Sequence, residues 1–233
     1  MVNVDTVYQR VLAIANKEQR GYITPLEFNL LANQTQLEIF ENYFIELNQA
    51  LAAQGNESEY SDIVKTLNEK IGVFKTDATL TLSTTGVTNG YHQYPADMHK
   101  LGTVYTGVSA SAQTGSIVNG VEIQGINYDE LLDYANSPLT RPSQTRPLYI
   151  RSAEGLRVIP DTTQAVVATY TKRPSEVEWG YVVVNEQALY NANSSQNFEL
   201  HVSEETTLVM KILGLAGIVI QRQELIALGQ QQA

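Results

Sequence analysis

The chain of 233 residues contains no cysteine, which excludes disulfide bonds and thiolate ligands for a metal. It also lacks an apolar run of the roughly 20 residues that a membrane-spanning helix needs. Its longest apolar run, residues 208–220, is shorter and is interrupted by Lys211. The first residues do not follow the basic and then apolar pattern of a signal peptide. We therefore expect a protein that is made in a cytoplasm and does not associate with a membrane.

Positive charge is scarce: 15 Lys and Arg stand against 25 Asp and Glu, which gives a net charge of −10. This net negative charge argues against a module that binds the phosphates of a nucleic acid. The bases are concentrated in residues 141–173, which hold six bases and two acids. Such a basic segment can pair with another copy of the chain or with an acidic neighbour. Alternatively, its arginines are solvated ends of strands.

Signatures of catalysis are also missing. Gly214 and Gly217 lie in a predicted helix and are not followed by the Lys-Ser or Lys-Thr of a phosphate-binding loop. No nucleophile elbow marks a serine. His92, Asp97 and His99 could together hold a metal, although histidines near a turn are commonly exposed. We therefore expect no enzymatic activity, no metal and no cofactor.

The first third of the chain predicts helices. Thr24, Pro25 and Glu27 form a strong start signal, with Thr24 as N-cap and Glu27 closing a capping box. This helix is expected to reach about residue 55, with shorter helices before it, capped by Asp5, and after it. Apolar residues at three- and four-residue steps give the long helix a coiled-coil-like seam: Leu30, Leu37, Phe40, Phe44, Leu47 and Leu51. The seam can either pack inside one subunit or meet another subunit.

The middle of the chain predicts strands. Residues 78–82 and 101–108 have strand composition, and residues 148–170 read as a meander that turns at Glu154 and Gly155. Residues 109–120 are small and polar and predict a loop. The predicted fold class is α+β: a helical layer with a long N-terminal helix and a C-terminal apolar helix, plus an inserted antiparallel β region. The predicted domains are a helical scaffold, residues 1–75 with 203–233, and a β-rich domain, residues 76–202.

The last helix, predicted over residues 207–220, is apolar on all sides except at Lys211. A helix of this kind must be covered all round. Gly214 and Gly217 share one of its faces and would let another backbone approach closely. The cover can come from other layers of the same subunit or from neighbouring copies.

Three stretches carry a family resemblance: residues 7–29, the module from Arg146 through Tyr170 to Trp179, and residues 198–218. Together they span nearly the whole chain. They resemble the neck or tail-tube ring proteins of short-tailed phages, most closely those of crAss-like phages, whose fold is of the tail-tubular or connector type. The resemblance implies a non-enzymatic virion protein of the neck or tail, made in the cytoplasm of the bacterial host.

The resemblance further implies a homo-oligomeric ring, expected to be a dodecamer, that is stacked below the portal protein. Such a ring joins portal and tail, contacts the neighbouring ring, tail or fibre proteins, and lines the channel through which double-stranded DNA passes without specific binding. The candidate interface residues are Arg141, Arg146, Arg151, Arg173, Trp179, Lys211, Gly214 and Gly217.

Three alternatives remain at this point. The first is a tail-fibre or stopper adaptor subunit of the same virion. The second is a glycan-binding module that uses its tyrosines and Trp179. The third is a metal-dependent enzyme that uses His92, Asp97 and His99.

Overall fold

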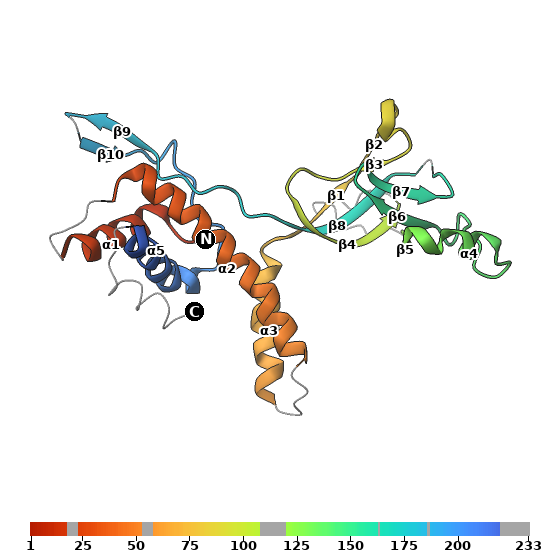
Figure 1. Cartoon of the computed structure of the whole chain (residues 1–233), viewed down its shortest axis with the longest axis horizontal. Coiled ribbons are helices and arrows are strands. Elements are labelled where there is room, and N and C mark those ends of the chain that lie inside the picture. Colours follow the sequence, from red (N-terminus) through yellow and green to blue (C-terminus); the bar gives the residue numbers. More distant parts are fainter. Residues whose placement is uncertain (18–22, 53–57, 108–119, 163, 186, 220–233) are drawn as a thin grey trace. The chain divides into compact units, whose positions relative to one another are not determined.

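The structure, a computed structural model, describes residues 1–17, 23–52, 58–107, 120–162, 164–185 and 187–219. The chain divides into two compact units (Figure 1). The helical unit comprises Met1–Val73 and Pro174–Ala233, and the sheet unit comprises Phe74–Arg173. The sheet unit is therefore an insertion within the helical unit. The expected boundaries lay at 75/76 and 202/203, so residues 174–202 belong with the helices and not with the strands.

The helical unit contains α1 (Val4–Lys17), α2 (Pro25–Ala52), α3 (Ser58–Gly72) and α5 (Glu205–Val219). It also holds a separate two-stranded sheet, β9 (Tyr181–Val184) and β10 (Gln187–Tyr190). α2 begins where the capping box predicted, because Glu27 Oε2 accepts a hydrogen bond from the Thr24 backbone N at 2.9 Å. The cap of α1 is Asn3 rather than Asp5: Asn3 Oδ1 accepts from the backbone N of Asp5 at 2.8 Å.

The core of the helical unit forms where α5 packs against α1 and α2. Fully buried side chains from all three helices meet there: Val7, Val11, Phe28, Ala32, Leu208 and Ile212. The segment that precedes α5 is also buried in this core, through Phe198 and Leu200. Phe198 pairs with Val2 as an isolated antiparallel bridge. The start of the chain is thus held to the segment before α5 by backbone hydrogen bonds as well as by apolar packing.

The described residues of the sheet unit form eight strands. They are β1 (Lys75–Thr79), β2 (Thr81–Leu82), β3 (His92–Gln93), β4 (Met98–Thr106), β5 (Val121–Ile126), β6 (Leu148–Ser152), β7 (Gly155–Ile159) and β8 (Val166–Lys172). Their order in the sheet is β1-β8-β4-β5-β6-β7-β3-β2. The apolar side chains of this unit gather in one main cluster that includes Val104, Ile123, Leu156 and Val166.

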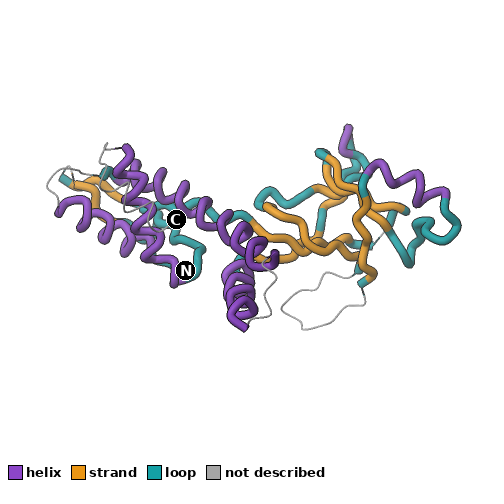
Figure 2. The backbone as a smooth tube through the Cα atoms, turned by 60° about the horizontal axis from the view of Figure 1, so that its bottom comes forward, coloured by secondary structure: helices purple, strands orange, loops and turns teal. Residues whose placement is uncertain are grey.

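Two features give this sheet its form. β5 and β6 pair in parallel, with the short helix α4 (Leu131–Asn136) in their connection, whereas the other neighbours are antiparallel. The two strands at the ends of the order, β1 and β2, are separated only by Leu80, which is buried and donates its backbone N–H to Val166 O at 2.8 Å. The sheet therefore curls almost into a barrel (Figure 2).

The predicted fold class is wrong. Over the described residues the structure is a mixed α/β fold, with a large, nearly barrel-like sheet of eight strands and five helices, and not a helical layer with a long N-terminal helix plus an antiparallel β region. The physical reason lies in pairings over long sequence distances. Alternation of apolar and polar residues marks a strand, but it does not show that β5 and β6 run in parallel.

Two further predictions concern the loops and the membrane. The loop predicted over residues 109–120 lies, except for Gly120, outside the described residues. Within the described ranges, no helix has both the length and the apolar character that crossing a membrane requires.

Candidate functional site

The arginines predicted to form an interface lie in the sheet unit and are exposed. Arg141, Arg146, Arg151 and Arg173 share this exposure with Arg157. Among the residues that the structure describes, none of these five arginines forms an ion pair. Arg146 Nη1 donates to Leu139 O at 3.2 Å, and Arg151 Nη2 donates to Tyr149 Oη at 3.3 Å. These side chains therefore present positive charge to solvent.

The helical unit has the opposite character. By sequence the sheet unit holds eight bases and eight acids, and the helical unit holds seven bases and seventeen acids, so the helical unit carries the whole net charge of −10. Three of its bases are already paired at 2.6 Å: Arg10 with Glu205, Lys70 with Glu204, and Lys211 with Glu38. Lys211, a predicted interface residue, thus makes its ionic contact within its own unit.

Trp179 is a core residue, although it was predicted at an interface. Its side chain is 2% exposed, and its Nε1 donates to Asp5 Oδ1 at 2.9 Å. The indole also contacts the ring of Tyr8, with centroids 4.3 Å apart. A ring that is covered in this way cannot stack on a sugar, so the glycan-binding alternative loses one of the residues on which it rested, and only its tyrosines remain.

Gly214 and Gly217 are buried as well. They lie on α5, whose apolar side chains Leu208, Ile212, Leu213 and Ala216 are all buried in the helical unit. The described part of α5 is therefore covered by its own subunit and not by a neighbouring copy. Neither glycine lies on an exposed surface.

Sequence reasoning missed a ladder of amide side chains on α2. Asn33 Oδ1 accepts from Val177 N at 2.7 Å, and Asn33 Nδ2 donates to Val177 O at 2.9 Å. Asn29 makes the same pair of hydrogen bonds with the backbone of Trp179: its Oδ1 accepts from Trp179 N at 2.8 Å, and its Nδ2 donates to Trp179 O at 3.4 Å. Gln36 Nε2 donates to Ser175 O at 2.8 Å. These three amides replace a neighbouring strand for residues 175–179. Their spacing, four and then three residues along one helix, is the signal that could have revealed them.

Two apolar surfaces of the helical unit remain exposed. The first, which we call the leucine stripe, consists of Leu26, Leu30, Leu37 and Leu51 on α2 and is 39–66% exposed. Steps of four, seven and fourteen residues place its members along one line of the helix. Of the seam predicted for this helix, Leu30, Leu37 and Leu51 are thus exposed, Phe40 is buried, and Phe44 and Leu47 are half-buried.

The second exposed apolar surface is the hairpin of β9 and β10, in which Tyr181, Val182, Val183, Val184, Leu189 and Tyr190 are 38–62% exposed. Its base is fixed by Trp179, whose ring contacts those of Tyr181 and Tyr190 at centroid distances of 5.9 and 5.8 Å. Asn185 has a φ of +49°, which the first residue of a tight hairpin turn requires and which Asn tolerates.

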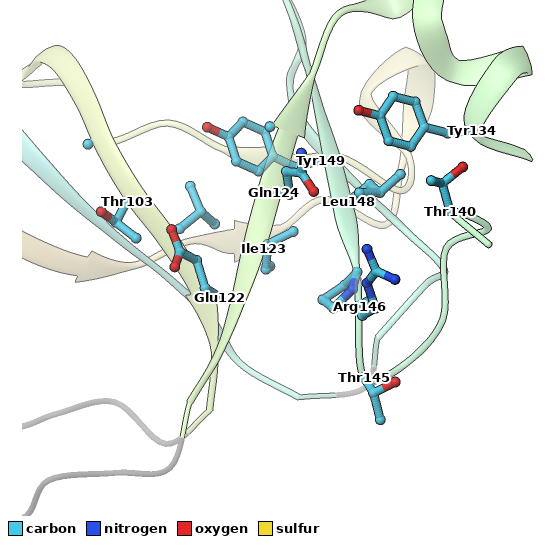
Figure 3. Close-up of a pocket in the computed structure, with 14 residues that line it drawn as sticks. Thr103, Glu122, Ile123, Gln124, Tyr134, Thr140, Thr145, Arg146, Leu148 and Tyr149 are labelled. Atoms are coloured by element: carbon cyan, nitrogen blue, oxygen red, sulfur yellow. The ribbon is translucent and has the colours of Figure 1, made fainter.

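The sheet unit carries a pocket of about 480 Å³ (Figure 3). Glu122 and Arg146 lie on different sides of it, and Tyr134, Tyr149 and Gln124 add polar groups. The ring of Tyr149 lies so close to Gly125 that a Cβ there would be 2.7 Å from Tyr149 Cζ. The pocket is thus lined by one of the exposed arginines and by an acidic side chain that does not pair with it.

The predicted metal ligands are not brought together. His92 is buried, which lowers its pKa, and Asp97 instead accepts a hydrogen bond from Tyr170 Oη at 3.1 Å. Burial, together with this bond, raises the pKa of Tyr170 above its ordinary value, so Tyr170 donates as a neutral phenol. Within the described ranges, no group of three or more His, Asp or Glu side chains has the arrangement of a metal site. His201 has a local structural role, because its Nδ1 accepts a hydrogen bond from Ser203 N at 3.3 Å.

Comparison with known proteins adds no assignment. No protein-family model matches the chain, and no curated protein matches it.

Proposed function

We propose that this chain is a structural virion protein that forms a homo-oligomeric ring in the neck of a short-tailed phage, where it joins portal and tail. The observation that carries this proposal is the separation of charge between the two units. Five exposed arginines without an ion pair among the described residues lie on the sheet unit, and the helical unit carries the whole net charge of −10. The sequence resemblance to neck ring proteins supports the same function.

This separation of charge favours contact between copies of the chain. Two like surfaces would repel each other, whereas the sheet unit of one copy attracts the helical unit of the next. A contact between two different surfaces leaves one of each free, so it repeats from copy to copy and closes into a ring when the rotation allows. Arg146 and Arg173, near the two ends of the basic segment, are our candidates for the contact.

An acidic ring also suits a channel for DNA. Many copies of a subunit with a net charge of −10 would present a negative wall, along which DNA slides without binding. The lumen would then be lined mainly by acidic residues. A basic lumen would exclude this sliding mechanism but not the ring itself.

The first experiment is the mass of the purified protein, alone and mixed with a candidate portal protein, measured by light scattering with negative-stain images. We expect a large closed oligomer in at least one of the two samples. A strict monomer that ignores the portal protein would refute the neck ring. It would instead favour the tail-fibre or stopper adaptor.

A charge reversal tests the contact itself. Arg146→Glu and Arg173→Glu should each shift the mass toward the monomer, because the arginine would become a carboxylate facing an acidic unit. Lys65→Glu is the matched control, since Lys65 is an exposed base of the helical unit, and it changes the net charge by the same amount. High salt should weaken assembly of the wild type in the same direction. Unchanged ring formation by both arginine variants would reject the charge pairing.

A further inference from the structure

The leucine stripe and the hairpin lie on the same compact unit, yet both are exposed. They therefore do not cover each other within one chain. An exposed apolar stripe opposite the buried side of a helix is typical of a helix that is covered on both sides. Surfaces of this kind on a soluble protein commonly mark an interaction site.

The hairpin has one face that its own unit does not support. Val182 pairs with Leu189 in the register of the two strands, so these two side chains and Val184 share one face. The other face carries Tyr181 and Tyr190, which contact Trp179. A two-stranded hairpin alone is marginally stable in water, and its apolar face needs a surface to pack against.

The leucine stripe fits that face in length and character. The four-residue strands are about 13 Å long at about 3.3 Å per residue. Leu26 to Leu37 span about 16 Å at about 1.5 Å per residue of helix. No charged residue lies in β9 or β10, so packing of these two strands would bury no charge of their own.

We infer that the hairpin of one copy packs its Val182, Val184 and Leu189 face onto Leu26, Leu30 and Leu37 of the neighbouring copy. The inference rests on the proposed function, because it names an apolar contact between neighbours of the same ring. Burying a Val or Leu side chain stabilises by about 1.5–3 kcal/mol at about 25 cal/mol per Å², which corresponds to about 60–120 Å² each, so the exposed fractions give about 200–400 Å² for both surfaces together. A specific interface buries at least about 1,000 Å², so this contact forms its apolar centre and the charge contact supplies the remainder.

The partner that packs its hairpin on the leucine stripe is a second copy of the chain, for a geometric reason. The two surfaces differ from each other and lie on every copy, so each copy offers one hairpin and accepts one. Such a contact repeats in one direction around a ring and needs no additional protein.

Cysteine cross-linking tests this contact cleanly, because the chain has no cysteine of its own. Leu30→Cys copies and differently tagged Val182→Cys copies are mixed and mildly oxidised. We expect disulfide-linked dimers that contain one copy of each kind. A double variant that carries both Leu30→Cys and Val182→Cys in one chain should give a ladder of linked oligomers. Val87→Cys replaces Val182→Cys in the control, since Val87 is an exposed valine of the sheet unit. Leu26→Cys and Leu37→Cys extend the test along the stripe.

The outcomes separate this inference from the proposed function. If light scattering shows the ring but none of the three stripe cysteines links to Val182→Cys above the control, the hairpin contact is refuted and the ring stands. If the double variant stops at doubly linked dimers, the contact is a two-fold pairing and its place in a ring is refuted. If no oligomer forms, the inference and the proposed function fail together. The fluorescence of the buried Trp179 checks that each variant remains folded.

Discussion

The amide ladder on α2 makes a quantitative prediction about the stability of the helical unit. Asn33→Ala removes both hydrogen bonds to the backbone of Val177, at 2.7 and 2.9 Å, where Val177 is buried. Each backbone group left without a partner costs about 1–2 kcal/mol. Alanine recovers about 0.5 kcal/mol because it favours helix more than asparagine does. The free energy of unfolding should therefore fall by roughly 1.5–3.5 kcal/mol.

The assay is urea denaturation followed by tryptophan fluorescence. Trp179 is the single tryptophan of the chain, and it is buried two residues from Val177, so its emission reports unfolding of the helical unit. Asn48→Ala is the matched control, because Asn48 is an exposed asparagine of the same helix. It should be neutral or stabilising by about 0.5 kcal/mol. If the two variants unfold at the same urea concentration, the ladder does not stabilise the unit and the reasoning is refuted.

Two further predictions concern the sheet unit, and hydrogen exchange of peptides from β7 and β8 measures both. Gly155→Ala should destabilise this unit by about 3 kcal/mol, since Gly155 has a φ of +139° and a Cβ there would lie 2.5 Å from His92 O. Gly86→Ala, with a φ of +69° and open space, should cost only about 1 kcal/mol; equal costs would show that the clash is unimportant. Burial lowers the pKa of His92 below 6.5, so protonation of His92 favours the unfolded state. Protection of the β7 and β8 amides from hydrogen exchange should therefore fall as the pH drops below about 6.5 toward the folded-state pKa. His92→Gln should lose part of this dependence, and an unchanged pH profile would contradict the role of His92.

The elements that sequence reasoning located are those specified by neighbouring residues. The start of α2 depends on Thr24 and Glu27, three positions apart, and the turn between β6 and β7 depends on Glu154 and Gly155. The failures involve distant partners. The position of Trp179 depends on Asp5 and Tyr8, which lie far away in the sequence, and nothing beside Trp179 indicates its burial.

For the interaction surfaces too, the sequence predicts the features that depend on one residue and misses those that depend on packing between distant elements. The exposure of Arg146 and Arg173 agrees with the sequence, because charged side chains are rarely buried without a partner. The pairing of Lys211 with Glu38 and the burial of Gly214 could not be foreseen, because they depend on how α5 packs against α2. The seam of α2 had two possible partners, and only the packing of the unit shows that Leu30, Leu37 and Leu51 have none within the described part of the chain.

The insertion of one unit within the other has a consequence for synthesis on the ribosome. The two ends of the sheet unit meet directly, since Lys172 N donates to Phe74 O at 2.9 Å, so this unit can fold as soon as residue 173 has emerged. α1 and α2, although made first, lack the buried partners Trp179, Phe198 and Leu208 until much later. At about 5–20 residues per second, the 167 residues from the end of α2 at Ala52 to the end of α5 at Val219 take about 8–33 seconds to synthesise. During that time the apolar face of the earliest helices is open to chaperones, and the part of the chain made second completes its fold first.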